Sequence, residues 1–117
     1  MAIILYVEDH PPARMLMEAI VSEMTTHQLA VAGSGAEARD IARTLKPALY
    51  IIDLDLPDTN GLELAQTLKT IHVAPMVVVS AYAEAVKESS INALAMTYLS
   101  KPLDPNHVAR IIERSLA

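Results

Sequence analysis

Continuous apolar runs alternate along this chain with stretches whose apolar residues recur every three or four positions. Residues 3–7, 48–52 and 76–79 form continuous runs, which is typical of strands buried on both faces of a parallel sheet. Residues 28–32 and 97–99 are weaker runs, and we expect the first of them at a sheet edge. The alternation predicts an α/β fold in which a five-stranded parallel sheet carries five helices on both faces.

Helix signals follow every strand run. Two prolines, at positions 11 and 12, suit the first turn of a helix that ends near Thr25. Residues 84–94 show the weakest helical pattern, because Ser89 and Ser90 lower the helix propensity. The other three helices are predicted to begin after the N-cap residues Ser34, Asn60 and Asp104.

The apolar positions of the first helix predict which of its faces is buried. Leu16, Ile20 and Met24 recur every four residues and are expected to form the buried stripe. Met15, Met17 and Met24 are interpreted as core filler rather than as a binding surface.

Length and composition exclude several classes of protein. The 117 residues suggest one domain over 1–117, and 52% of them are hydrophobic. A net charge of −5 and the absence of Phe and Trp argue against direct nucleic-acid binding. The absence of Cys excludes disulfides and thiolate chemistry. No run has the length of a signal or membrane segment, so we expect a cytoplasmic protein with no membrane partner.

Polar residues stand where the predicted strands end. Glu8 and Asp9 follow the first strand, Asp53 ends the third, Ser80 the fourth, and Lys101 follows the fifth. Ligands of open α/β sheets bind beyond this edge. Three carboxylates there favour a hard cation such as Mg²⁺. A phosphoryl group would complete the arrangement, with Asp53 as nucleophile, Lys101 and Mg²⁺ neutralising charge and the Ser80 hydroxyl donating to an oxygen.

These residues, in this order, resemble the receiver domains of two-component response regulators over essentially the whole chain. Asp53, followed by Pro57 and Gly61, matches the phosphoacceptor and its loop. The other matching elements are the acidic pair Glu8-Asp9, the hydroxyl pair Ser80-Ala81, the aromatic position Tyr98 and the pair Lys101-Pro102. The resemblance implies a flavodoxin-like (βα)5 fold with strand order 2-1-3-4-5.

The resemblance also implies a mechanism. A histidine kinase or phosphotransfer protein would phosphorylate Asp53, with Mg²⁺ held by Asp9, Asp53 and the carbonyl of Asp55, and by Glu8 mostly through water. Ser80 and Tyr98 would then switch position. The surface of the fourth helix, fifth strand and fifth helix would be read by a downstream protein or a missing output domain, or would form a homodimer. Such a protein is not an enzyme beyond its own phosphorylation and dephosphorylation.

Two other functions stay open. Asp53-Leu54-Asp55 also resembles the Asp-x-Asp signature of haloacid-dehalogenase-type phosphatases, although those place it on the first strand. An unphosphorylated docking module is the other alternative. Asp55, Tyr82 and His10 flank the site in ways whose effect on the chemistry the sequence leaves open, and it does not tell a stand-alone receiver from a piece of a larger regulator.

Overall fold

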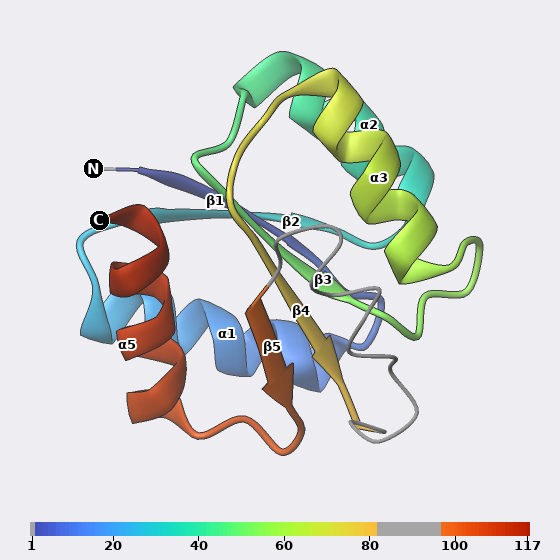
Figure 1. Ribbon diagram of the computed structural model, residues 1–117. Helices are drawn as coiled ribbons and strands as arrows, with labels where there is room; N and C mark the ends of the chain where they lie inside the picture. The colour runs from blue at the N-terminus through green and yellow to red at the C-terminus, as the bar shows by residue number, and fades with distance from the viewer. Residues whose placement is uncertain (1, 82–96) are drawn as a thin grey trace.

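The computed structural model describes residues 2–81 and 97–117. Within these residues one parallel sheet has the strand order β2-β1-β3-β4-β5, which confirms the predicted order (Figure 1). The helix expected at residues 84–94, and Tyr82 before it, lie outside the described residues. The strands are β1 Ile3–Val7, β2 Gln28–Ala32, β3 Leu49–Asp53, β4 Met76–Ser80 and β5 Thr97–Ser100.

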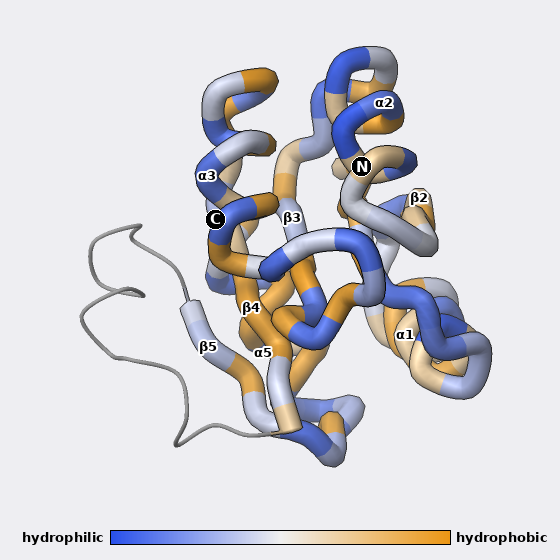
Figure 2. The backbone as a smooth tube through the Cα atoms, turned by 90° about the vertical axis from the view of Figure 1, so that its right-hand side faces the viewer, coloured by the Kyte–Doolittle hydropathy of each residue, from blue (hydrophilic) through white to orange (hydrophobic). Residues whose placement is uncertain are grey.

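Helices lie on both faces of the sheet, as the alternation predicted. In Figure 1, α1 and α5 lie on one face and α2 and α3 on the other. Strand side chains alternate between the two faces, so each face has its own apolar cluster, and both clusters draw on β1, β3 and β4. The hydropathy colouring of Figure 2 shows the same arrangement, with apolar strands at the centre. The described helices are α1 Pro11–Met24, α2 Gly35–Leu45, α3 Gly61–Ile71 and α5 Pro105–Leu116.

The predicted buried stripe of α1 is wrong in two of its three positions. Ile20 is buried, but Leu16 is 39% exposed and Met24 41% exposed. The buried residues are Met17, Ile20 and Val21, so the inward face is rotated by about one residue from the predicted one. The periodicity was read correctly, but apolar residues also occupy the outer face. The core-filler interpretation therefore holds for Met17 and fails for Met24, and also for Met15, which is 68% exposed.

Local capping explains where three helices begin. The Ser34 hydroxyl accepts a hydrogen bond from the Glu37 N–H at 3.2 Å, and the Asn60 side chain accepts from the N–H groups of Leu62 and Glu63. Asp104 accepts from the N–H of the second residue of α5. By contrast, α1 begins after His10 without a side-chain cap, and prolines occupy its first turn. Glu8 and Asp9 are therefore not needed as caps.

The parallel strands bring their carboxyl ends to one edge of the sheet. Val7 pairs with Ile52, Asp53 with Val79, and Ser80 with Ser100. Polar residues that are far apart in sequence therefore meet at this edge. None of the helices in the described ranges is both long enough and apolar enough to cross a membrane.

Candidate acidic site at the carboxyl edge of the sheet

Asp53 lies at the centre of a buried charged cluster. Its side chain accepts a hydrogen bond from Lys101 Nζ at Oδ2 (3.2 Å) and from the Asp55 N–H at Oδ1 (3.0 Å). Lys101 Nζ also lies 3.5 Å from Glu8 Oε1. Glu8 and Asp53 are 0% and 2% exposed, so this lysine bridges two carboxyl groups that are shielded from water. Residues 8, 53 and 101 therefore meet although β1, β3 and β5 are not consecutive in the chain.

Burial separates the pKa values of the two carboxyl groups. Burial raises the pKa of Glu8 to about 8, and the hydrogen bond and negative charge of Asp53 add to this effect. Burial also acts to raise the pKa of Asp53, but the hydrogen bonds from Glu8 and the Asp55 N–H and the charge of Lys101 outweigh it, so the pKa is lowered. Burial acts against the charged form of Lys101, yet the two carboxyl groups hold its pKa above the ordinary value. In the absence of a cation, the ionised pair is Asp53 and Lys101.

Asp9 completes a group of oxygen ligands. One carboxylate oxygen from each of Glu8, Asp9 and Asp53 lies within 4.8 Å of the others, and Asp9 is exposed. Carboxylate oxygens are the ligands that Mg²⁺ prefers, and an open side suits a cation that keeps several waters. The Asp55 carboxylate is exposed and does not belong to this group of described residues; its N–H contacts Asp53 instead.

Ser80 and Tyr98 come from the two strands on the other side of Asp53. Ser80 ends β4 and is 3% exposed, and Tyr98 is half-buried in β5. The Tyr98 hydroxyl donates to the Ser80 carbonyl at 3.5 Å, and the Lys101 N–H donates to the same carbonyl at 3.0 Å. The three positions singled out on β4 and β5 therefore meet at one backbone group, next to Asp53 in the sheet.

Sequence reasoning missed two residues that hold the loops of this site. The Arg14 Nε of α1 donates to the Glu8 carbonyl at 2.6 Å. Asp58, in the loop after Asp53, accepts hydrogen bonds from the Gly35 and Ala36 N–H groups at the start of α2. Asp58 acts on a helix that begins 23 residues earlier, so no local capping signal could have identified it.

Gly61 sets how closely α3 approaches the end of β3. A Cβ atom at Gly61 would lie 2.6 Å from Leu54 Cα, closer than a side chain can approach. The loop between Asp53 and α3 therefore folds back tightly on the strand that carries the nucleophile candidate.

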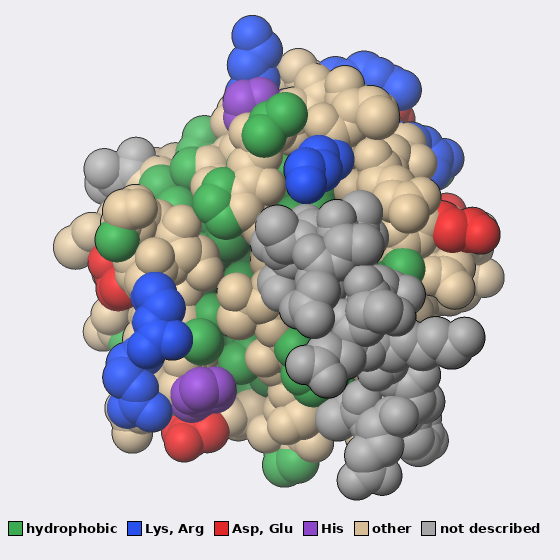
Figure 3. All heavy atoms as spheres, viewed as in Figure 1, with side chains coloured by type: hydrophobic (Ala, Val, Ile, Leu, Met, Phe, Trp, Pro, Cys, Tyr) green, Lys and Arg blue, Asp and Glu red, His purple; other side chains and the backbone are tan. Residues whose placement is uncertain are grey.

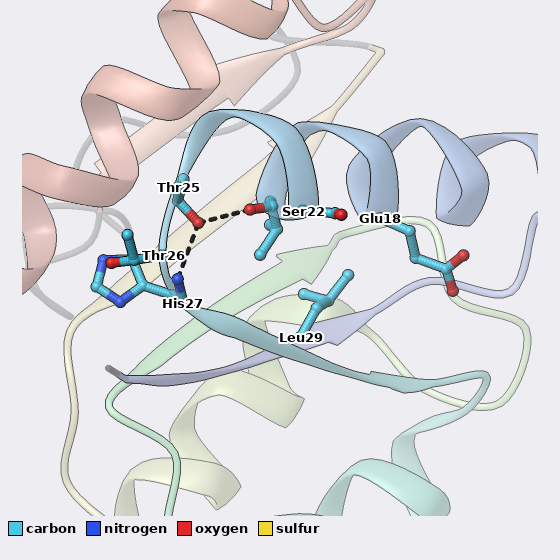
Figure 4. Close-up of a pocket in the computed structure, with 7 residues that line it drawn as sticks. Glu18, Ser22, Thr25, Thr26, His27 and Leu29 are labelled. Carbon is cyan, nitrogen blue, oxygen red and sulfur yellow. Dashed lines mark hydrogen bonds between the residues drawn. The ribbon is translucent and has the colours of Figure 1, made fainter.

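The hollows in the described surface include one beside the acidic cluster and one away from it. One, of about 520 Å³, adjoins the acidic cluster and is lined mainly by His10, Pro12, Leu16, Lys101, Pro102 and Leu103. The other, of about 380 Å³, lies between the end of α1 and the start of β2, away from Asp53. Figure 4 shows that its polar groups bond to one another: the Thr25 hydroxyl donates to the Val21 carbonyl and accepts from the His27 N–H. We therefore assign the chemistry to the first region.

Charge is dispersed on the face that Figure 3 draws. Among its described residues, the Lys and Arg side chains form small groups that are separated by other surface, without a continuous basic stripe. The described part of this face therefore offers no extended cationic track of the kind that follows a nucleic-acid backbone.

Known proteins resemble this chain over most of its length. The family model described as response regulator receiver domain matches residues 4–113. Among curated proteins, a protein-glutamate methylesterase/protein-glutamine glutaminase of Myxococcus xanthus is 36% identical over 87% of this chain and 30% of its own length. The transcriptional regulatory protein PdtaR of Mycobacterium tuberculosis is 30% identical over 97% of this chain and 56% of its own length. The chain thus spans less than two thirds of either relative.

Solved structures agree on the fold. The chemotaxis protein CheY4 of Vibrio cholerae superimposes with a TM-score of 0.90 at 22% identity, covering 99% of both chains. A CheY-like receiver domain from Methylobacillus flagellatus gives a TM-score of 0.88 at 26% identity, over 97% of this chain and 98% of the other.

Proposed function

Because this chain belongs to the response regulator receiver domain family, we propose that it is a signalling switch that is phosphorylated on Asp53. The observation that carries the proposal is the buried Asp53 carboxylate, which contacts the Lys101 ammonium and has an oxygen within 4.8 Å of oxygens of Glu8 and Asp9. The donor is a phosphohistidine of a histidine kinase or of a phosphotransfer protein. Residues 1–117 act as one receiver domain, whether alone or within a longer regulator.

The proposed reaction transfers a phosphoryl group from nitrogen to oxygen. A carboxylate oxygen of Asp53 attacks phosphorus, the phosphorus–nitrogen bond of the phosphohistidine breaks, and its electron pair returns to the imidazole. The product is an acyl phosphate, which water later hydrolyses back to the carboxylate and inorganic phosphate. The lowered pKa keeps Asp53 ionised and therefore nucleophilic at neutral pH. Lys101 Nζ, at 3.2 Å from Oδ2, provides positive charge where the phosphoryl oxygens accumulate negative charge.

The residues present fit a Mg²⁺ ion. The carboxylates of Asp9 and Asp53 would hold it with the Asp55 carbonyl, and Glu8 would contribute mostly through water. The oxygens of Glu8, Asp9 and Asp53 that lie within 4.8 Å of one another are the hard ligands that this cation takes, and the exposed Asp9 leaves an open side for its waters. A bound Mg²⁺ supplies charge that neutralises the carboxylates and the transferred oxygens.

In this proposal Ser80 and Tyr98 change position when Asp53 carries the phosphoryl group. The Ser80 hydroxyl donates to a phosphoryl oxygen, and Tyr98 turns inward behind it. The change reaches the face formed by the fourth helix, β5 and α5, where a downstream protein, an output domain or a second copy of the chain binds. In this scheme the protein catalyses only its own phosphorylation and dephosphorylation, and acts in the cytoplasm.

The hollow beside Lys101 supports an approach route for the donor. Its walls are apolar residues of α1 and of the segment after β5, and it opens next to the Asp53 cluster. A helix carrying a phosphohistidine could place its apolar side chains against Pro12, Leu16 and Leu103 while the imidazole reaches Asp53.

Intact mass spectrometry tests the proposal. The protein is incubated with Mg²⁺ and acetyl phosphate, beside the variants Asp53→Asn and Asp55→Asn. We expect one added phosphoryl group on the wild type and on Asp55→Asn, and none on Asp53→Asn or without Mg²⁺. Labelling that survives in Asp53→Asn would reject Asp53 as the acceptor. A protein that never labels favours the docking module, and one that turns over a generic phosphomonoester favours the phosphatase.

A further inference from the structure

Two buried oxygen atoms at the carboxyl end of β1 have no hydrogen-bond partner among the described residues: the hydroxyl of Tyr6, within the strand, and Oε2 of Glu8, directly after it. Both residues are 0% exposed. Buried polar atoms are nearly always hydrogen-bonded, because an unpaired group loses its bonds to water without replacement. Two such atoms only two residues apart in the chain are therefore an unusual pair.

Strand geometry places both side chains on the same side of the sheet. Residues 6 and 8 differ by the period of two that a strand imposes. Tyr6 belongs to the apolar cluster between the sheet and helices α1 and α5, so its ring is held by packing. Burial, and after it the negative charges of Glu8 and Asp53, raise the pKa of the Tyr6 hydroxyl, so these acidic groups lie near it.

The unpaired oxygen of Glu8 is a suitable acceptor for the Tyr6 hydroxyl. The Tyr6 ring is surrounded by apolar residues of the cluster, and the Arg14 Nε is already engaged with the Glu8 carbonyl. Glu8 Oε1 contacts Lys101, so Oε2 is the carboxyl oxygen that lacks a donor. A tyrosine hydroxyl is a donor, and a carboxylate oxygen is the acceptor that would bind it most strongly.

We propose that Tyr6 is a positioning residue of the Mg²⁺ site, whose hydroxyl donates to Glu8 Oε2, directly or through one buried water, when the cation is bound. This inference rests on the proposed function. The hydroxyl fixes the orientation of Glu8 when this carboxyl group turns toward the cation, as outer partners of metal ligands commonly do. In the absence of the cation, Glu8 is held by Asp53 and Lys101, and the hydroxyl is left without a partner.

The substitution Tyr6→Phe tests the role, since it removes one oxygen and keeps the ring. Tyr50→Phe is the matched control: Tyr50 is also a 0% exposed strand tyrosine, but its hydroxyl donates to the His72 carbonyl at 2.7 Å on the opposite face of the sheet. For each protein we would measure Mg²⁺ affinity by calorimetry, the melting temperature with a chelator present, and the labelling rate by acetyl phosphate as a function of Mg²⁺ concentration.

We expect Tyr6→Phe to weaken Mg²⁺ binding about tenfold, as loss of an outer partner of a metal ligand typically does. Its melting temperature without Mg²⁺ should not fall, because the hydroxyl is unpaired there. Its labelling rate at saturating Mg²⁺ should stay within about twofold of the wild type, since Tyr6 acts through Glu8 and not on the phosphoryl group. Tyr50→Phe should show the reverse, a lower melting temperature and unchanged Mg²⁺ affinity.

Failure of the inference is distinct from failure of the proposed function. If the wild type binds Mg²⁺ and Tyr6→Phe binds it equally well, the positioning role is wrong and the receiver function stands. If Tyr6→Phe only lowers the melting temperature, the hydroxyl is structural and the inference is again overturned. If the wild type itself does not bind Mg²⁺, the proposed site fails and the inference fails with it.

Discussion

Replacing Glu8 by glutamine should make the protein more stable at alkaline pH, although it removes a buried group from the acidic site. Glu8 is 0% exposed, and burial raises its pKa from the ordinary 4.5 to about 8. Between these values the unfolded chain has released the Glu8 proton while the folded chain still holds it. The free energy of unfolding of the wild type therefore falls as pH rises through this window, and levels off above about 8.

The size of the effect follows from the width of the window. Each pH unit contributes at most about 1.4 kcal/mol, so three units, from pH 5 to 8, give an upper limit of about 4 kcal/mol. The titration of Glu8 is coupled to the charges of Lys101 and Asp53, which reduces the effect. We therefore expect the free energy of unfolding of the wild type to fall by about 1–3 kcal/mol between pH 5 and 8. The amide of Glu8→Gln can donate to Asp53 as the protonated carboxyl group does, so the two proteins should be about equally stable at pH 5.

Urea unfolding between pH 5 and 9, with a chelator present, measures this difference. The control is Glu18→Gln, because Glu18 is exposed on α1 and the pH dependence should stay that of the wild type. Asp53 does not interfere, since its lowered pKa gives stability that is lost only as pH falls below the ordinary carboxyl range. A stability gain of Glu8→Gln that is constant with pH, or one that shrinks from pH 5 to 8, would refute the reasoning.

Three further predictions concern residues around the acidic site. Lys101→Met should slow labelling by acetyl phosphate at least about tenfold without weakening Mg²⁺ binding, because Lys101 competes with the cation for the same carboxylates; calorimetry and mass spectrometry separate the two effects. Asp58→Ala should lower the urea midpoint of unfolding, because the Gly35 and Ala36 N–H groups at the start of α2 lose their acceptor, whereas Asp40→Ala, at an exposed ion pair, should lower it less. Leu16→Glu should slow transfer from a phosphohistidine protein but not from acetyl phosphate, while the similarly exposed Leu45→Glu on α2 should change neither.

The strands were predictable because burial on both faces leaves a direct trace in the sequence, whereas their order was predicted only from the resemblance to receiver domains. Runs such as residues 49–53 are apolar at every position before the acid, and the structure buries each one. The inward face of α1 was predicted wrongly, since Leu16 and Met15 are as apolar as the buried residues beside them. Periodicity identifies a helix, but when both faces carry apolar residues it cannot tell which face packs against the sheet.

The meeting of residues at the sheet edge was predictable, but their hydrogen bonds were not. Strand ends fix where Glu8, Asp53 and Lys101 lie, because strand order alone brings them together. Arg14 and Asp58 act through backbone groups, a carbonyl and two N–H groups, which every residue has. Such contacts leave no residue-type signature at the partner position, and only coordinates reveal them.

The surroundings of Asp53 differ on its two sides in the sheet, and this difference decides which side a phosphoryl group on Asp53 would move. On one side Asp53 adjoins β1, a central strand whose following residue Glu8 is tied back by its own N–H to the Ala32 carbonyl and by its carbonyl to Arg14. On the other side lie Ser80, Tyr98 and Lys101, which meet at one carbonyl beside β5, a strand of four residues that pairs with β4 alone among the described strands. An edge strand has ladder bonds on one side alone, so it yields more readily than a central one.

A phosphoryl group that draws Lys101 and Ser80 toward itself would therefore move the β4–β5 side and leave the β1 side in place. That direction agrees with an output surface at β5 and α5, and it is open to test by comparing amide exchange in β2 and β5 before and after labelling.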